Sequence, residues 1–257
     1  MLARVTLVQV HDLADVVVVV GFTALCAALA AVIAWRSRFG IARDQLTAAA
    51  RATAQLAVVG AIITAVLHSW WFTALFCTAM IAIAGLTSAR RVTGHATAWT
   101  LIPVATGSLT GGLAIAATRL VPLTPIATVP VLGILIGNAM TATSLAGRSM
   151  HAAMRDHFEV YAGALALGLP VPVSADIVAR PAAPLALVPG LDQTRTVGLV
   201  TLPGAFVGAL LGGASPAQAA AVQLIVLAAL LLVQAVAVSL TVHLFVRGRL
   251  GQFRPAG

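Results

Sequence analysis

The feature that most constrains this chain is a series of continuous apolar runs, each about 20 residues long. A helix needs about 20 apolar residues to cross a bilayer, whereas transmembrane strands are about half as long and alternate polar with apolar positions. The runs therefore predict an all-α, polytopic integral membrane protein in which residues 1–257 form a single transmembrane domain. We expect about seven transmembrane helices, at residues 13–34, 46–67, 70–87, 98–117, 125–146, 196–212 and 217–246.

Composition supports the same class of protein. Hydrophobic residues make up 60% of the chain and charged residues 9%, whereas a soluble domain carries about 25% charged residues. The first apolar run, 16–34, is too long for the core of a signal peptide, so we interpret it as the first membrane helix. Cys26 and Cys77 both lie within apolar runs, which indicates neither a disulfide framework nor metal-ligand spacing, and any metal site stays unknown.

Arginine placement predicts the orientation of the helices. With the N-terminus outside and the C-terminus inside, the inner segments contain thirteen arginines and the outer segments two. This excess follows the positive-inside rule, so the net charge of +8 indicates membrane topology and not nucleic-acid binding. The outer arginines are Arg4 and Arg119; the inner ones are Arg36, Arg38, Arg43, Arg51, Arg90, Arg91, Arg148, Arg155, Arg180, Arg195, Arg247, Arg249 and Arg254.

The longest polar interruption, residues 147–195, holds four of the seven acidic residues and is predicted to be cytoplasmic. After a break at Pro170 and Pro172, we expect Ser174 to cap a short helix in which Asp176 and Arg180 form an i, i+4 ion pair. The segment is either a docking platform or a solvated connector. Its first part predicts an amphipathic helix whose apolar face carries Met150, Met154, Phe158, Tyr161 and Leu165.

Polar side chains within the apolar runs are candidates for a translocation path. A charge in the bilayer is costly, so Arg51 is either buried in protein or extends to the interface. Gly133 and Gly137 in the fifth run fit either helix packing, within the chain or across a dimer, or the lining of a path. In the last run Gln223, Gln234 and Thr241 share one face, which we expect to point into the bundle. The candidate path residues are Arg51, Gln55, Asn138, Met140, Thr141, Ser144 and Gln223.

The sixth run contains a candidate hinge, where Pro203 precedes Gly204 and Gly208. Proline removes a backbone hydrogen bond and favours a kink, and kinked membrane helices mark backbone that moves or faces water. The alternative is a tightly packed helix without contact to a substrate. At the start of the seventh run, Ser215 and Gln218 predict a capping box.

Several functional classes lack their motifs. The chain contains no lysine, which excludes a Walker A loop, and it has neither HExxH nor GxSxG, so we expect no enzyme activity. A stand-alone secondary transporter or channel would need ionisable groups at mid-membrane, and Arg51 alone comes near that depth. That class and a purely structural membrane anchor are the alternatives to the function suggested below.

Five blocks of the sequence carry a resemblance to a known family. They keep their order over about residues 45–245: RATAQL at 51–56, GNAM at 137–140, ALALG at 164–168 after Glu159, VGLVTLPG at 197–204, and GGASP at 212–216. Together they resemble the permease subunits of iron-export (Fet-type) ABC transporters, a family with plant relatives linked to aluminium tolerance. The chain departs from the family pattern at 205–207, where Ala-Phe-Val replaces Met-Met-Thr and removes soft thioether ligands.

The resemblance implies a multi-pass protein of the cell membrane that works as a homodimer with two copies of a separate cytoplasmic ABC ATPase. Such a transporter exports a metal ion, or a metal-linked solute, using ATP bound by the partner, and this chain itself binds no cofactor. The resemblance also implies a coupling surface for the ATPase, at Arg155, Glu159, Gly168, Asp176 and Arg180.

Overall fold

The computed structural model describes residues 13–251, and all regular structure in that range is helical. The chain divides after Ser69 into two compact units, which are described separately. The first unit is a hairpin of α1 (Leu13–Arg36) and α2 (Ala42–His68). The second unit contains α3 (Trp70–Thr93), α4 (Leu101–Thr118), α5 (Pro125–Asp156), α6 (Phe158–Ala166), α7 (Val171–Ala179), a 3-10 helix (Arg180–Ala186), α8 (Val188–Thr196), α9 (Gly204–Leu211) and α10 (Pro216–Val246).

Seven helical stretches of the described chain are long and apolar enough to cross a membrane, as the sequence predicts. Six of them match predicted spans; α5 continues ten residues beyond its predicted end, because residues 147–156 remain helical past the apolar run.

The predicted sixth span is wrong. The sixth candidate span is Val171–Thr196, and residues 196–212 contain only the eight-residue helix α9. Twenty-six residues of helix cover about 39 Å, enough for a bilayer core of about 30 Å, whereas eight cover about 12 Å. The prolines and charges within 171–196 led the sequence analysis to assign this segment to a polar connector. Asp176 and Arg180 form an ion pair, which lowers the cost of placing their charges in an apolar span.

The segment 147–195 is consequently not one polar platform. Its first part ends α5 and forms α6, with a break at His157, while its second part belongs to the sixth candidate span. The predicted apolar face is confirmed across the break, since Met150, Met154 and Tyr161 are buried. Ser174 is not a cap: α7 begins at Val171 after Pro170, and the Ser174 hydroxyl donates back to the Pro170 carbonyl at 3.2 Å.

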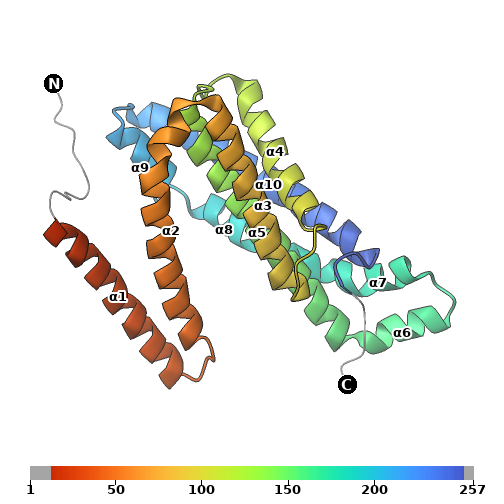
Figure 1. Ribbon diagram of the computed structural model, residues 1–257. Coiled ribbons are helices and arrows are strands. Elements are labelled where there is room, and N and C mark those ends of the chain that lie inside the picture. Colours follow the sequence, from red (N-terminus) through yellow and green to blue (C-terminus); the bar gives the residue numbers. More distant parts are fainter. Residues whose placement is uncertain (1–12, 252–257) are drawn as a thin grey trace. The chain divides into compact units, whose positions relative to one another are not determined.

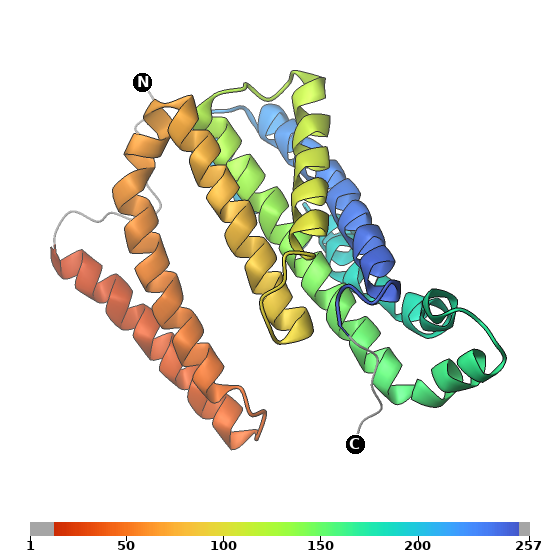
Figure 2. The same cartoon turned by 45° about the vertical axis from the view of Figure 1, so that its right-hand side comes forward.

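The core of the second unit lies where α10 and α5 pack against each other and against α3 and α4 (Figures 1 and 2). Glycines set the close approaches: a Cβ at Gly107 would lie 3.0 Å from the Val233 carbonyl oxygen, and one at Gly147 would lie 2.6 Å from the Val92 methyl groups. These contacts join α4 to α10 and α5 to α3. Of the glycine pair expected to pack the fifth span, a Cβ at Gly133 would lie 3.3 Å from the terminal methyl of Met80, while a Cβ at Gly137 would meet no atom within 4 Å.

The start of α10 is confirmed in detail. The Ser215 hydroxyl accepts from the backbone N–H of Gln218, and the Gln218 side chain accepts from the Ser215 N–H, which completes the capping box. Gln223, Gln234 and Thr241 are all buried, so the predicted polar face of this helix does point into the bundle. Arg4 and Arg254, which contribute to the predicted orientation, lie outside the described residues.

Candidate functional site

A pair of amide side chains lies inside the second unit, where α5 meets α10. The Gln234 amide donates from Nε2 to Oδ1 of Asn138 at 3.0 Å, and Asn138 donates from Nδ2 to the backbone carbonyl of Ile134 at 2.9 Å. Gln234 is 6% exposed. Since lipid offers no hydrogen-bond partners, a hydrogen bond between these two amides favours one register of α5 against α10.

The sixth candidate span closes over this amide pair at Gly190 in α8. The space where a Cβ of residue 190 would stand is occupied by the end of the Gln234 side chain. Any side chain at position 190 would have to displace the Gln234 amide from this place. The α8 backbone is further tied at the same place by Thr194, whose hydroxyl donates to the Gly190 carbonyl at 2.8 Å. Three helices therefore meet at one polar point.

Immediately after this point the sixth span loses its helical form. α8 ends at Thr196, residues 197–203 form a tight loop, and α9 begins at Gly204. Within the loop the Gly198 N–H donates to the Thr201 carbonyl at 2.9 Å, with Gly198 in the left-handed region at φ +81°. Figure 1 shows α9 beside the start of α10, at the end of the unit opposite α6 and α7. Non-helical backbone at membrane depth is tolerated where protein covers it or where it lines a water-filled cavity.

Three buried acceptors along α5 and α10 lack a hydrogen-bond partner within the described chain: Oγ1 of Thr143, Oε1 of Gln223 and Oε1 of Gln234. Buried polar atoms are rarely left unpaired in native proteins, so each of these requires a water, an ion or a moving partner. All three lie on α5 and α10, the two helices at the centre of the second unit. Gln223 is eleven residues from Gln234, about 16 Å along α10, so the two amides mark different depths.

The predicted path residues fall into three environments. Asn138 belongs to the amide pair, and Gln223 is buried on α10. Ser144 instead joins α5 to α3, where its hydroxyl lies 2.8 Å from that of Ser88; Ser88 also approaches the carbonyl of Met140 at 3.3 Å. The remaining three are exposed, namely Arg51 and Gln55 on α2 and Thr141 on α5.

The predicted hinge residues border the break in the sixth span. Pro203 does not kink a continuous helix, as expected, but occupies the N-cap position of α9 in an extended conformation. Gly204 and Gly208 follow within α9, and a Cβ on either would meet no atom within 4 Å. The flexible element is therefore the seven-residue loop before the proline.

The predicted coupling residues lie at the end of the unit that holds α6 and α7. Glu159 is exposed in the first turn of α6, and Gly168, at φ +85°, ends that helix in the left-handed conformation that favours glycine. The predicted ion pair is confirmed, with Arg180 Nε donating to both carboxylate oxygens of Asp176 at 2.9 and 2.8 Å. Arg155, exposed near the end of α5, lies apart from this pair and lines an open pocket described below.

Gly190, Ser88 and Thr194 were missed by the sequence analysis. Nothing in the local sequence distinguishes Gly190 and Ser88, since each acquires its role from a helix distant in the chain, whereas the Thr194 bond is local to α8. Among residues 13–251, no cluster of three or more His, Cys, Asp or Glu side chains could hold a metal ion.

Comparison with known proteins shows which family this chain belongs to. The model of an uncharacterised protein family, UPF0014, matches residues 17–249, nearly the whole helical part of the chain. The chain belongs to the UPF0014 family. The membership confirms the resemblance at the level of a family of multi-pass membrane proteins.

UPF0014 relatives occur in plants and bacteria. The chain is 32% identical to "UPF0014 membrane protein STAR2" of Oryza sativa subsp. japonica, over 78% of this chain and 72% of the rice protein. It is 30% identical to "Protein ALUMINUM SENSITIVE 3" of Arabidopsis thaliana, over 77% and 74% of the two chains. The "Probable iron export permease protein FetB" of Escherichia coli is 31% identical over 40% of this chain and 39% of its own. No solved structure matches the chain significantly.

Proposed function

We propose that this UPF0014 protein is the membrane-spanning permease subunit of an ABC transporter. In this proposal, a separate cytoplasmic ATPase subunit binds and hydrolyses ATP, and two copies of the present chain form the translocation unit in the cell membrane. The transported species is a metal ion or a metal-linked solute, moved outward.

The observation that carries the proposal is the non-helical loop 197–203, which follows the sixth span just after α8 packs on the Asn138–Gln234 pair. A broken helix that packs against a polar point in a bundle gives a transporter both a binding site and a flexible element. Tilting α8 about residues 197–203 would withdraw Gly190 from Gln234 and expose the unpaired acceptor to a substrate.

The division of labour with an ATPase is supported by two features. The chain has no lysine and hence no Walker A loop, so nucleotide hydrolysis needs another subunit. Exposed Glu159 in α6 offers an accessible carboxylate for that subunit, since no ion pair among the described residues engages it. Because Asp176 and Arg180 lie in the sixth candidate span, we assign the coupling contact to α6.

Export of a metal rests on the relatives' names. One relative is named as a probable iron export permease, and another is named for aluminium sensitivity. Oxygen acceptors such as Gln223 and Gln234 suit hard cations or a hydrated ligand better than soft metals. We therefore expect transport to favour an oxygen-ligated species.

Purification of the tagged protein from native membranes in mild detergent tests the permease assignment. We expect an ATPase subunit to co-purify in equal amount, two copies of each chain per complex, and ATP hydrolysis by the preparation. A protein that purifies alone and still moves solute in vesicles without ATP would instead be a secondary transporter or channel.

Charge reversal at Glu159 tests the coupling contact. Glu159→Arg should abolish the stimulation of the ATPase by the permease while leaving the protein inserted and monodisperse. Asp44→Arg is the matched control, because it reverses an exposed carboxylate on α2, a helix of the other compact unit. Equal stimulation by Glu159→Arg and the unaltered protein would remove Glu159 from the coupling role.

A further inference from the structure

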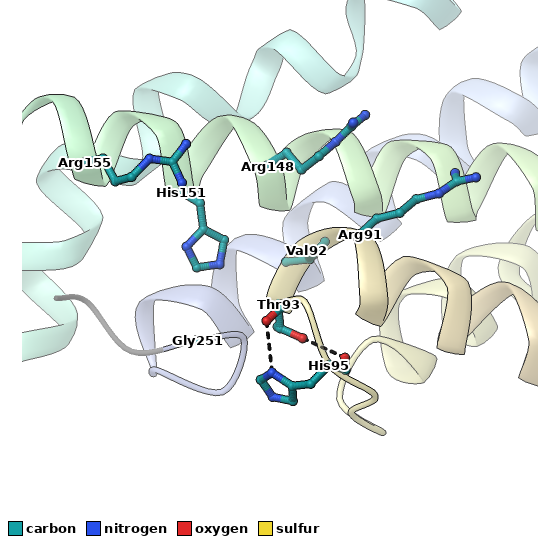
Figure 3. Close-up of a pocket in the computed structure, with 8 residues that line it drawn as sticks. All are labelled: Arg91, Val92, Thr93, His95, Arg148, His151, Arg155 and Gly251. Carbon is teal, nitrogen blue, oxygen red and sulfur yellow. Dashed lines mark hydrogen bonds between the residues drawn. The ribbon is translucent and has the colours of Figure 1, made fainter. Parts of the chain in front are cut away.

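A basic pocket that the proposed transport function does not use lies at one end of the second unit. It has a volume of about 680 Å³ and is formed by the end of α3, the last turns of α5 and the turn that follows α10. In Figure 3 the side chains of Arg91 and Arg148 extend in the same direction, with Arg155 and His151 on the neighbouring turns of α5. The lining residues are Arg91, Val92, Thr93, His95, Arg148, His151, Arg155 and Gly251.

Tertiary contacts position the arginines of this pocket. Val92 packs against Gly147 so closely that a Cβ there would lie 2.6 Å from its methyl groups, and the adjacent residues in sequence are Arg91 and Arg148. The tight α3–α5 contact therefore brings two guanidinium groups from different helices to the same pocket. Arg155 lies seven residues after Arg148, two turns further along the same face of α5.

The wall opposite the arginines is held by the turn after α10. His151 shares a hydrogen bond of 2.9 Å between Nε2 and the carbonyl oxygen of Leu250, and its ring packs edge-on against Phe245 with centroids 4.8 Å apart. Leu250 is fully buried, and a Cβ at Gly251 would lie 2.7 Å from the imidazole. This wall is packed as firmly as a core, so the pocket is a built feature and not a gap between mobile side chains.

The positive charge of the pocket is not balanced within the described chain. The two ion pairs found among residues 13–251 join Arg180 to Asp176 and Arg195 to Asp192, and neither involves a pocket arginine. Arginine side chains that line one pocket repel each other, and an anion bound there would relieve that repulsion. Phosphate suits this arrangement best, because its oxygens accept the paired N–H donors of arginine bidentately.

The position of the pocket favours a phosphate carried by a lipid. The pocket lies where the apolar spans α3 and α5 end, and Ile83 and Leu86, about one and a half to two turns before Arg91, are exposed in the manner of a lipid-facing surface. Next to it, Arg249 stacks over the ring of Trp99 at 4.6 Å, and tryptophan is enriched at the membrane interface. Basic pockets between membrane helices on the cytoplasmic side hold anionic headgroups. We propose that this pocket binds the phosphate of an anionic phospholipid in the cytoplasmic leaflet. The positive-inside rule predicts that leaflet for this end of the helices.

Lipid titration of the purified, delipidated full chain tests this proposal. Binding is measured by native mass spectrometry and by the thermal unfolding midpoint, with phosphatidylglycerol, with phosphatidylcholine of the same acyl chains, and with inorganic phosphate. We expect phosphatidylglycerol to bind at least about tenfold more tightly than phosphatidylcholine, and Arg148→Gln or Arg155→Gln to weaken it about tenfold each.

Arg90→Gln provides the matched control. It removes the same charge from the residue next to Arg91, but Arg90 is exposed outside the pocket, so its affinity for phosphatidylglycerol should stay within about twofold of the unaltered protein. Arg148 and Arg155 are both exposed, which makes folding of their variants expected, and either one suffices for the test if the other is not monodisperse.

Four results would overturn the proposal. The first two are equal affinity for the two lipids, and a loss of lipid affinity in Arg90→Gln equal to that in Arg148→Gln. The third is stabilisation by inorganic phosphate that matches the lipid, which would indicate a soluble phosphate ligand. The fourth is loss of a co-purifying ATPase in Arg148→Gln without any change in lipid binding, which would indicate a protein partner. The binding measurement needs no transport or ATP hydrolysis, so its outcome is independent of the permease assignment.

Discussion

α2, α5 and α10 are all candidate membrane spans that carry polar residues. The polar residues of α2 are exposed, whereas those where α5 meets α10 are enclosed by other helices. Only 6% of the apolar stretch of α2 is buried inside the structure, and Arg51 and Gln55 on that helix are exposed. In α10, by contrast, 56% of the apolar stretch is buried, and Gln234 is held by Asn138 and Gly190. A polar residue in an apolar helix therefore does not reveal its role until its neighbours are known.

The comparison has an energetic consequence. Where protein surrounds a helix, as it does α10, added volume collides with fixed neighbours and lost hydrogen bonds leave buried groups unpaired. Where few protein atoms of its own unit surround a helix, as on α2, added volume meets no fixed neighbour and backbone propensity dominates. The same kind of substitution should then change stability in opposite directions in the two regions.

The largest expected effect comes from Gly190→Ala. The new methyl group would take the place of the Gln234 amide, break its bond to Asn138 and separate α8 from α10. We expect a loss of about 1–3 kcal/mol in the free energy of unfolding, measured by thermal denaturation in detergent. A variant as stable as the unaltered protein would mean that α8 moves freely over the amide pair.

Gly60→Ala in α2 should have the opposite sign. A Cβ at Gly60 meets no atom within 4 Å, and the residue lies inside a helix, so alanine lowers the entropy of the unfolded chain without a clash. We expect stabilisation of about 0.5–1 kcal/mol in the same denaturation assay. Destabilisation would show that another surface packs on α2 at this point and would erase the contrast with α8.

The smallest expected effect is the coupling between the two amides. A double-mutant cycle of Asn138→Leu and Gln234→Leu should give an interaction energy of about 0.6 kcal/mol, the average for hydrogen bonds between membrane helices. Gln55→Leu on α2 serves as the single-site control and should change stability by less than about 0.5 kcal/mol. An interaction energy near zero would imply that Gln234 already exchanges between Asn138 and another partner.

Prediction from sequence succeeded where a property is local. The apolar runs, the ion pair at Asp176 and Arg180, and the capping box at Ser215 depend on residues within one or two turns, and all are confirmed. The sixth span was misplaced because prolines and charges within Val171–Thr196 resemble those of a connector, and only their mutual pairing and packing against α5 and α10 distinguish it.

The sequence predicted some of the polar residues of the site but not the contacts between them. The sequence pointed to Asn138 as a polar residue in a span, and the spacing of Gln223, Gln234 and Thr241 predicted their inward face. It did not pair Asn138 with Gln234, which is 96 residues away, or identify Gly190 as the residue that closes over them. Side-chain contacts between helices depend on rotation and tilt, which no local pattern specifies.

The sequence by itself determined that this protein is a bundle of apolar helices, because hydropathy acts on each segment separately. Only the tertiary structure decided where the sixth span breaks, which amides meet, and that Arg91, Arg148 and Arg155 surround one pocket. Those features arise from close approaches at Gly147 and Gly190, where the absence of a side chain matters only once another helix is in place.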